Sequence, residues 1–352
     1  MKNKFLNKIF QNLSPYVPGE QPGDNEFIKL NTNENPFSPP AQVLKAIKNG
    51  INESLKKYPD PLATELRKTI GKRYGFPHEW VFAGNGSDEI LRLSIIAFSS
   101  VGEQVTFLYP SYPLYDVLAT ISDRKVCKIP LLPDFHMPED FVSRYTDCLK
   151  VVANPDSPSG LFHPVELIEE VVKKAKRVVI IDEAYADFAE KNCLHLAKKY
   201  GNVLITRSFS KSFSLAGIRL GYCFGNPDLI SALFAIKDSY NLNSLSQIAG
   251  IAAMNNYHLV QKNCIRIIKN RQFLKKQLET IGFYVFPSSA NFLFVRPPDG
   301  AAEQIYQYLK ANKILVRYFN IQDLKDYLRI TVGSRNQIYT LLKAVKKYYG
   351  YQ

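Results

Sequence analysis

Hydrophobic and polar positions alternate regularly between about residue 40 and residue 225. Short apolar runs are separated by stretches in which apolar residues recur every three or four positions, such as Asp88–Phe98 and Pro164–Lys174. The runs predict strands at Val81–Ala83, Val105–Leu108, Val126–Ile129, Val151–Ala153, Val178–Ile181, Val203–Thr206 and Tyr222–Phe224. Strands that alternate with helices predict crossover connections and a largely parallel sheet covered on both faces, so the predicted fold class is α/β.

The pattern becomes mainly helical after Pro227. A long amphipathic stretch over residues 246–280 predicts a helix that links two lobes, and the rest of the chain mixes short strands with helices. We therefore expect an N-terminal arm over residues 1–35, a large domain over residues 36–245 and a smaller α/β C-terminal domain over residues 246–352. The pattern leaves open which lobe the N-terminal arm joins.

Length and composition agree with a folded protein of two lobes. The chain has 352 residues, of which 46% are hydrophobic and 22% charged, whereas a domain usually holds roughly 100–200 residues. No apolar run approaches the roughly 18–20 residues of a membrane span. One helical face near the start of the chain is apolar, through Phe5, Leu6, Ile9, Phe10 and Leu13. This face favours an arm docked on the fold or on a partner subunit over a membrane-surface helix.

Charge and cysteine usage disfavour several other classes of protein. The formal net charge is +13, but the basic residues are scattered in small groups typical of solvated helix faces, so we expect no nucleic-acid partner. The five cysteines are widely spaced and never form CxxC, which argues against a disulfide framework and a zinc site. We expect no metal and a reducing, cytoplasmic environment. The five histidines are isolated, which leaves lysine as the best catalytic candidate.

Polar residues follow the predicted strands, at the edge of a parallel sheet where ligands bind. The segment Gly84-Asn85-Gly86-Ser87-Asp88-Glu89 leads from a strand into a helix, and free N–H groups at a helix start attract anions. It is either a phosphate cradle or an ordinary helix cap. Because it matches neither GxGxxG nor a Walker loop, dinucleotide-binding and NTP-binding proteins are disfavoured.

Two further strand ends carry candidate residues. Asn154 opens the loop Asn154–Gly160, for which a plain turn is an equally good interpretation. Asp182 follows the buried strand Val178–Ile181. A carboxylate at such a position is costly unless a metal, a cation or a protonated ring nitrogen pairs with it. We therefore interpret Asp182 as a functional residue.

The strongest candidate segment follows the strand Val203–Thr206. Lys211 lies among serines and apolar residues, and Arg219 comes eight positions later. Such a lysine can be an amine of lowered pKa beside an anion clamp. A serine-rich surface loop explains neither the flanking apolar residues nor the apolar Leu215-Ala216-Gly217. Lys211 is therefore the predicted catalytic residue.

Several motifs together carry a resemblance to a known family. Tyr112, Asn154-Pro155, Asp182-Glu183-Ala184-Tyr185 and Ser208-Phe209-Ser210-Lys211 with Arg219 resemble the fold type I pyridoxal-phosphate aminotransferases. Within that superfamily the chain is similar, from end to end, to the histidinol-phosphate aminotransferases. This closer similarity rests on Pro15-Tyr16-Val17-Pro18-Gly19, Leu30-Asn31-Thr32-Asn33-Glu34-Asn35-Pro36, Tyr58-Pro59-Asp60, Gly84-Asn85-Gly86-Ser87-Asp88-Glu89, Arg317 and Leu328-Arg329-Ile330-Thr331-Val332-Gly333. The resemblance implies a mostly parallel mixed sheet flanked by helices, plus a smaller α/β C-terminal domain.

The resemblance implies pyridoxal 5′-phosphate as the cofactor. Lys211 would hold it as a Schiff base and then, as a free amine, move a proton between the substrate Cα and the cofactor C4′. Asp182 would pair with the pyridinium nitrogen, and Tyr112 would stack on the ring. Asn154 and Tyr185 would bind the ring hydroxyl. The cofactor phosphate would be held by Gly86, Ser87, Asp88, Ser208, Ser210 and Arg219.

The resemblance also implies a homodimer with shared active sites. A tyrosine matching Tyr58 reaches the cofactor phosphate of the neighbouring subunit in the family. Tyr16, Arg317 and Arg329 match positions that recognise the phosphate of histidinol phosphate and the carboxylate of glutamate. The implied reaction transfers an amino group from L-histidinol phosphate to 2-oxoglutarate.

The loop Asn154–Gly160 departs from the commoner Asn-Pro-Asn-Asn-Pro-Thr-Gly of the family, so the specificity stays open. An aromatic amino-acid aminotransferase and a threonine-phosphate decarboxylase remain alternatives within the superfamily. A ligand-sensing regulator built on this fold and a nicotinamide-dependent dehydrogenase are disfavoured, the latter because the chain lacks the glycine fingerprint.

Overall fold

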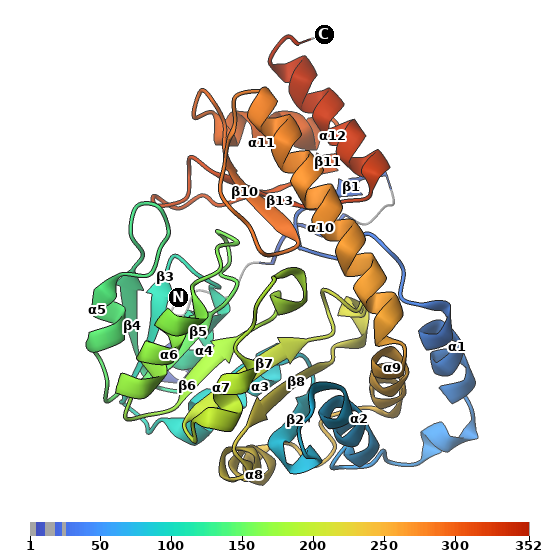
Figure 1. Ribbon diagram of the computed structural model, residues 1–352, viewed down its shortest axis with the longest axis vertical. Helices are drawn as coiled ribbons and strands as arrows, with labels where there is room; N and C mark the ends of the chain where they lie inside the picture. Colours follow the sequence, from blue (N-terminus) through green and yellow to red (C-terminus); the bar gives the residue numbers. More distant parts are fainter. Residues whose placement is uncertain (1–4, 11–17, 23–25, 352) are drawn as a thin grey trace.

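A seven-stranded sheet forms the centre of the larger lobe in the computed structural model, which describes residues 5–10, 18–22 and 26–351 (Figure 1). The strands are β2 (Val81–Gly84), β3 (Gln104–Tyr109), β4 (Lys125–Pro130), β5 (Leu149–Ala153), β6 (Val179–Asp182), β7 (Val203–Ser208) and β8 (Gly221–Gly225), in the order β2-β8-β7-β6-β5-β3-β4. The strand β8 runs antiparallel to both β2 and β7, and the other neighbours are parallel. The predicted mostly parallel, mixed sheet is confirmed.

Helices cover both faces of this sheet (Figure 1). They are α2 (Thr64–Tyr74), α3 (Ser87–Phe98), α4 (Leu114–Ile121), α5 (Glu139–Ser143), α6 (Val165–Lys174), α7 (Leu194–Lys199) and α8 (Pro227–Ile236). The helix α1 (Ala41–Gly50) lies to the side of the sheet (Figure 1). Successive residues of β6 show why its sequence is apolar up to its last residue, Asp182. Ile180 packs in one buried cluster with Leu91 of α3, whereas Ile181 packs in another with Ile168 of α6. Apolar and polar residues alternate only in a strand with one solvent-facing side, so a strand buried on both faces is apolar at successive positions.

The smaller lobe is built on an antiparallel sheet in the order β12-β13-β10-β9. Its elements are β9 (Tyr284–Val285), β10 (Phe292–Arg296), α11 (Ala302–Ala311), β12 (Arg317–Tyr318), β13 (Leu328–Thr331) and α12 (Arg335–Tyr348). Beside them, β1 (Ile28–Lys29) pairs in parallel with β11 (Ile314–Leu315). This part of the N-terminal arm therefore joins the smaller lobe, which the sequence had left open.

The prediction of a single linking helix over residues 246–280 is wrong, because two helices occupy this stretch. They are α9 (Ser244–Asn255) and α10 (Tyr257–Thr280), which meet at Asn256. The Asn256 side chain donates to the Ala252 carbonyl at 2.8 Å, and its backbone leaves the helical conformation at φ −110° and ψ 28°. The helix α9 packs against α1 and α2, while α10 runs up to the smaller lobe (Figure 1). The domain boundary at residues 245 and 246 stays a prediction.

Two observations concern possible membrane contact. Within the described ranges, none of the helices combines the length and the apolarity needed to cross a bilayer. At the start of the chain a short 3-10 helix, Lys8–Phe10, is described, whereas the predicted apolar face extends to Leu13, which lies outside the described residues.

Candidate active site

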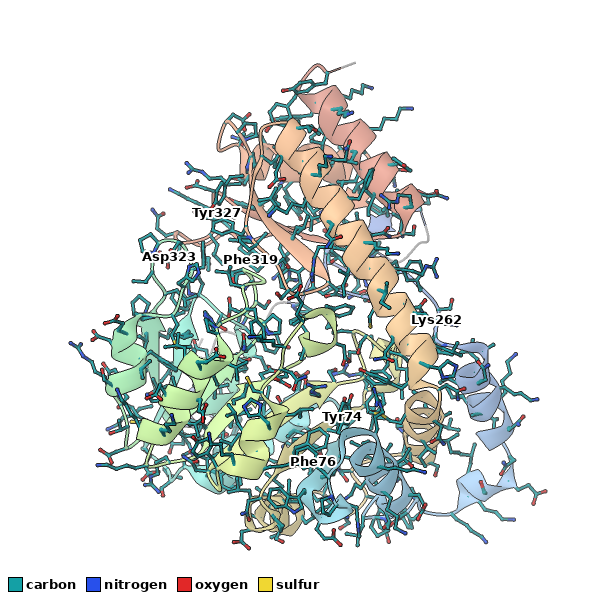
Figure 2. All side chains as sticks on the ribbon, in the orientation of Figure 1. Tyr74, Phe76, Lys262, Phe319, Asp323 and Tyr327 are labelled. Carbon is teal, nitrogen blue, oxygen red and sulfur yellow. The ribbon has the colours of Figure 1, made fainter. Side chains whose placement is uncertain are left out.

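A cavity of about 240 Å³ lies between the two lobes, beyond the carboxyl ends of strands of the large sheet. Most of the residues singled out in the sequence line it: Ser87, Asp88, Tyr112, Asp182, Tyr185, Ser208, Ser210, Lys211, Arg219, Arg317 and Arg329. The arm adds Asn31, Thr32, Asn33 and Glu34, and the smaller lobe adds Phe319, which lies at the junction of the lobes (Figure 2). The fold thus gathers residues from distant parts of the chain into one site.

Lys211 lies in the loop after β7, and its amine enters the cavity. The Nζ atom donates to the Thr32 carbonyl at 3.2 Å. Burial, together with the positive charge of Arg329, lowers the pKa of Lys211 from 10.5 to about 8, against the smaller opposing effects of Glu34 and Asp88. About a tenth of this amine is therefore neutral at pH 7, and the neutral form is the one that acts as a nucleophile or a proton acceptor.

Asp182 ends β6 at the floor of the cavity, and three donors surround its carboxylate. Oδ2 accepts from the Tyr115 hydroxyl at 2.7 Å, and Oδ1 accepts from the Thr206 hydroxyl at 3.2 Å and the Ala184 N–H at 3.1 Å. Burial raises the pKa of Asp182, and these hydrogen bonds oppose the rise. All three donors are neutral, so a cationic group in the cavity would complete the pairing that a buried carboxylate requires.

The start of α3 faces Arg219 and forms an anion cradle. Gly86 caps the helix at φ +82°, and Arg219 itself has a left-handed backbone. The Arg219 guanidinium lies 3.2 Å from Asp88 Oδ2 and donates to Ser210 Oγ at 3.4 Å. A Cβ atom on residue 86 would stand 2.7 Å from Arg219 Nη2 and would displace this guanidinium, and the positive φ itself favours glycine. Helix N–H groups, hydroxyls and a guanidinium together suit a phosphate.

Besides Tyr115, the rings of Tyr112 and Tyr185 contribute to the cavity wall. The Tyr112 ring packs edge-on against Tyr115, with the centroids 5.5 Å apart, and its hydroxyl lies 3.5 Å from Asp88 Oδ1. The Tyr185 hydroxyl accepts a hydrogen bond from Asn33 Nδ2 at 2.9 Å. The arm thus anchors one of the two rings.

Arg317 and Arg329 lie side by side because they are paired in register on β12 and β13. Arg329 donates from Nη1 to Ser157 Oγ and from Nη2 to the Asn31 carbonyl, both at 3.1 Å. The Phe319 ring centroid lies 5.3 Å from the Arg317 guanidinium carbon and 5.5 Å from that of Arg329. Two guanidiniums held in this way form a positively charged wall that can bind anionic substrate groups.

Three of the described site residues that were predicted, Gly86, Asn154 and Tyr58, are not on the cavity wall. The amide of Asn154 bonds the backbone of His163, at 2.8 Å through its oxygen and 3.1 Å through its nitrogen, which holds this fully buried side chain behind the wall. Tyr58 is 79% exposed and stacks on Tyr240, with the centroids 4.3 Å apart. Tyr16 lies outside the described residues. The prediction that Asn154 binds a ring hydroxyl stays a prediction.

The sequence reading missed several residues of the site. Tyr115 and Thr206 bind Asp182, Ser157 orients Arg329, and Phe319 covers both arginines. No local pattern marks these residues, because each acquires its role from a contact between distant segments. The arm residues Asn31–Glu34 belong to the segment Leu30–Pro36, and the resemblance of this segment to the histidinol-phosphate aminotransferases was the signal that could have identified them.

Residues 25–345 match the family model for aminotransferase class I and II, so the chain belongs to this family of aminotransferases. The histidinol-phosphate aminotransferase of Geotalea daltonii is 42% identical over 334 residues, which are 95% of this chain and 96% of the relative. That of Rhodopirellula baltica is 43% identical over 328 residues, 93% of this chain and 91% of the relative. Within the family, the chain belongs with the histidinol-phosphate aminotransferases.

A solved structure shows the same fold. The crystal structure of histidinol-phosphate aminotransferase from Sinorhizobium meliloti, in complex with pyridoxal-5′-phosphate, superposes with a TM-score of 0.89. It covers 98% of this chain and 99% of that chain at 24% sequence identity. The mixed, mostly parallel sheet flanked by helices is that of the fold type I aminotransferases.

The residues of the cavity fit pyridoxal phosphate on three observations. An amine with a pKa of about 8 can react with an aldehyde, and the buried carboxylate of Asp182 can hold a protonated ring nitrogen. The cradle of Gly86, Ser87 and Arg219 offers N–H and guanidinium donors to a phosphate, in a space that a Cβ at residue 86 would fill. The donors present therefore match the three reactive or charged parts of the cofactor.

Proposed function

We propose that the protein transfers the amino group of L-histidinol phosphate to 2-oxoglutarate with pyridoxal phosphate, giving imidazole acetol phosphate and L-glutamate in histidine biosynthesis. The observation that carries the proposal is one cavity that holds the Lys211 amine together with the paired guanidiniums of Arg317 and Arg329. The close relatives in the histidinol-phosphate aminotransferase family support the choice of substrates.

Pyridoxal phosphate, when bound, supplies an electron sink for the charge that develops at the substrate Cα. Lys211 binds it and moves a proton between Cα and C4′, a task for which a pKa of about 8 is suited. Asp182 holds a proton on the ring nitrogen through its carboxylate, which Tyr115 and Thr206 orient. Arg219 and the start of α3 hold the phosphate.

Arg317 and Arg329 bind the anionic ends of both substrates. A guanidinium can donate two parallel hydrogen bonds to a phosphate as well as to a carboxylate, so one pair of arginines serves a phosphate ester and a dicarboxylate in turn. The contacts of Arg329 with Ser157 and Asn31 restrict its orientation before the substrate arrives. We also propose that Tyr16 contributes to this recognition.

Steady-state kinetics with two amino donors and one decarboxylation substrate test the choice of substrate. Purified, cofactor-loaded protein is assayed with 2-oxoglutarate and either L-histidinol phosphate or phenylalanine, and separately for carbon dioxide release from threonine phosphate. The proposal requires the highest kcat/KM for histidinol phosphate. A higher value for phenylalanine would make the protein an aromatic aminotransferase, and carbon dioxide release would make it a decarboxylase.

We further propose a homodimer in the cytoplasm. Tyr58 is 79% exposed, and its ring stacks on Tyr240, which suits a side chain that reaches the phosphate in the active site of a second copy. All five cysteines are free thiols, which supports a reducing compartment.

A further inference from the structure

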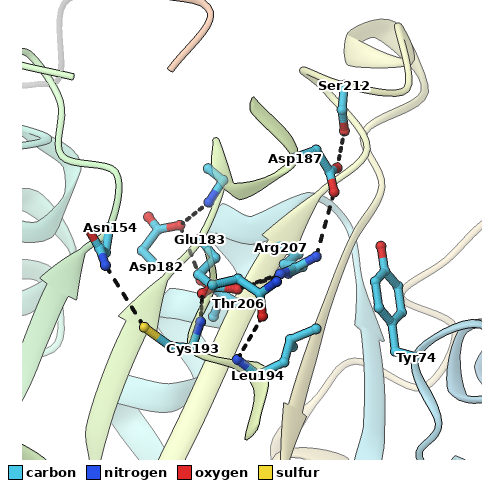
Figure 3. A network of polar contacts seen from close by, with 12 residues as sticks. Tyr74, Asn154, Asp182, Glu183, Asp187, Cys193, Leu194, Thr206, Arg207 and Ser212 are labelled. Carbon is cyan, nitrogen blue, oxygen red and sulfur yellow. Dashed lines mark hydrogen bonds and ion pairs between the residues drawn. The ribbon is translucent and has the colours of Figure 1, made fainter. Parts of the chain in front are cut away.

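A buried ion cluster lies behind the cavity (Figure 3). Arg207 on β7 is 4% exposed and donates from Nε and Nη2 to Glu183 Oε2 at 3.0 and 2.7 Å. Its Nη1 atom lies 3.6 Å from Asp187 Oδ1. One guanidinium thus faces two buried or half-buried carboxylates, whose charges would be costly to bury alone. The cluster of Glu183, Arg207 and Asp187 is therefore firmly held.

The cluster adjoins the two residues with the most direct chemical roles. Glu183 follows Asp182 in the chain, and Asp187 accepts a hydrogen bond from the hydroxyl of Ser212, which follows Lys211 (Figure 3). The carboxylate and the amine of the candidate site are thus each one residue away from a group in this network.

The cluster also contacts the start of the helix that links the lobes. Tyr257 is the first residue of α10, and its hydroxyl donates to Asp187 Oδ1 at 2.9 Å. The helix α10 continues into the smaller lobe, which carries Arg329 (Figure 1). Asp187 therefore binds the Lys211 loop through one oxygen and the base of α10 through the other.

We propose that Glu183, Arg207 and Asp187 form a positioning cluster that fixes the Lys211 amine relative to Asp182 and to the start of α10. This inference rests on the proposed function, because it takes the roles of the amine and the carboxylate from it. The three side chains do not line the cavity, so they act through Ser212 and Tyr257 and not on the substrate. Two N–H groups of Arg207 converge on one oxygen of Glu183, which restricts both side chains. A misplacement of about 1 Å in a site can cost about 100-fold in rate.

Two charge-neutral variants test the cluster, with a matched control. Ser212→Ala and Tyr257→Phe each remove one hydroxyl from Asp187 and leave every charge in place. Ser94→Ala is the control, since Ser94 is also fully buried but donates to the Ile90 carbonyl within α3, at 2.7 Å. The pH dependence of Lys211 acetylation in the cofactor-free protein, followed by mass spectrometry, gives the pKa of this amine.

The expected result is a rise in the Lys211 pKa from about 8 toward 10.5 in Ser212→Ala, because a released loop admits water to the amine. Tyr257→Phe should shift it in the same direction, and Ser94→Ala should leave it unchanged. In the loaded enzyme, both test variants should lower kcat roughly tenfold at little-changed KM. If Ser212→Ala does not fold, the Lys211 pKa and the kcat of Tyr257→Phe test the proposal.

An unchanged Lys211 pKa and kcat in the test variants, with a fall in unfolding temperature like that of Ser94→Ala, would overturn the proposal and leave the cluster a structural feature. The acetylation result does not depend on the substrate. Failure of the wild type to use histidinol phosphate would therefore count against the proposed function, and it would be distinguishable from a failure of the positioning cluster.

Discussion

The hydroxyl of Tyr115 donates a 2.7 Å hydrogen bond to Asp182 Oδ2 beneath the cavity. Both side chains are buried, and burial raises the pKa of each. The hydrogen bond stabilises the ionised form of Asp182 and so opposes the rise in its pKa. Tyr115 therefore helps to keep this carboxylate charged at the pH at which a protonated ring nitrogen needs it.

Replacing Tyr115 with Phe should raise the pKa of Asp182 further. A hydrogen bond to a charged group contributes about 1.5–3 kcal/mol, so we expect kcat/KM near neutral pH to fall at least tenfold. The acid limb of the pH profile of kcat/KM should move to higher pH, because the carboxylate takes up a proton sooner. Tyr222→Phe is a control, since Tyr222 is equally buried but bonds Tyr74. An unshifted acid limb in Tyr115→Phe would contradict this role.

The sequence predicted the features of the fold and of the site that have a local signal, and it did not predict those that depend on distant segments. Apolar runs identified the strands of the large sheet, and the segment around Lys211 identified the amine, because both signals are local. The antiparallel direction of β8 could not be predicted, since a strand buried on both faces has the same pattern in either direction. The break at Asn256 was hidden for a similar reason, because the amphipathic pattern continues across it.

Side-chain orientation was the least predictable part of the site. Asn154 follows β5 as expected, but its amide bonds the backbone of His163, nine residues further on. The pairing of Arg317 with Arg329 depends on the register of two strands separated by a loop. Such contacts arise from tertiary packing, which a single sequence does not display.

Lys211→Met should abolish turnover and stabilise the cofactor-free protein. The pKa of Lys211 falls from 10.5 to about 8 on folding. Between pH 8 and 10.5 the unfolded chain binds a proton that the folded chain does not, so wild-type stability rises with pH in this window. The variant should gain up to about 3 kcal/mol in free energy of unfolding at pH 7 and little at pH 10.5. Chemical denaturation at both pH values measures this, and an equal gain at each would contradict it.

Asp156→Asn should also stabilise the protein, with the opposite pH dependence. Asp156 is 1% exposed, accepts hydrogen bonds from Ser111 and Ser159, and has its pKa raised by burial from 3.8 to about 6. Between these values the folded chain keeps a proton that the unfolded chain has released, so wild-type stability falls as pH rises. The gain of the variant should be larger at pH 7.5 than at pH 4, by up to about 3 kcal/mol. Thermal unfolding that shows no such difference would count against the raised pKa.

Shared active sites predict complementation between two inactive subunits. Tyr58→Ala chains keep Lys211, and Lys211→Met chains keep Tyr58. In a purified mixed dimer, one of the two sites combines Lys211 of the first chain with Tyr58 of the second and is therefore intact. The mixed dimer should have about half of the wild-type activity. Each homodimer should remain weak or inactive. A mixed dimer without activity, or a monomer in sedimentation analysis, would show that Tyr58 does not act across an interface.

The central claim is that Lys211 and pyridoxal phosphate accept the amino group of L-histidinol phosphate. The most direct measurement is the absorbance spectrum of the cofactor-loaded protein before and after adding L-histidinol phosphate without a keto acid. A visible band that is lost to absorbance at shorter wavelength, and that returns on adding 2-oxoglutarate, is the predicted result. A visible band that histidinol phosphate leaves unmoved would contradict the substrate, and a band of equal strength in Lys211→Met would contradict the role of the lysine.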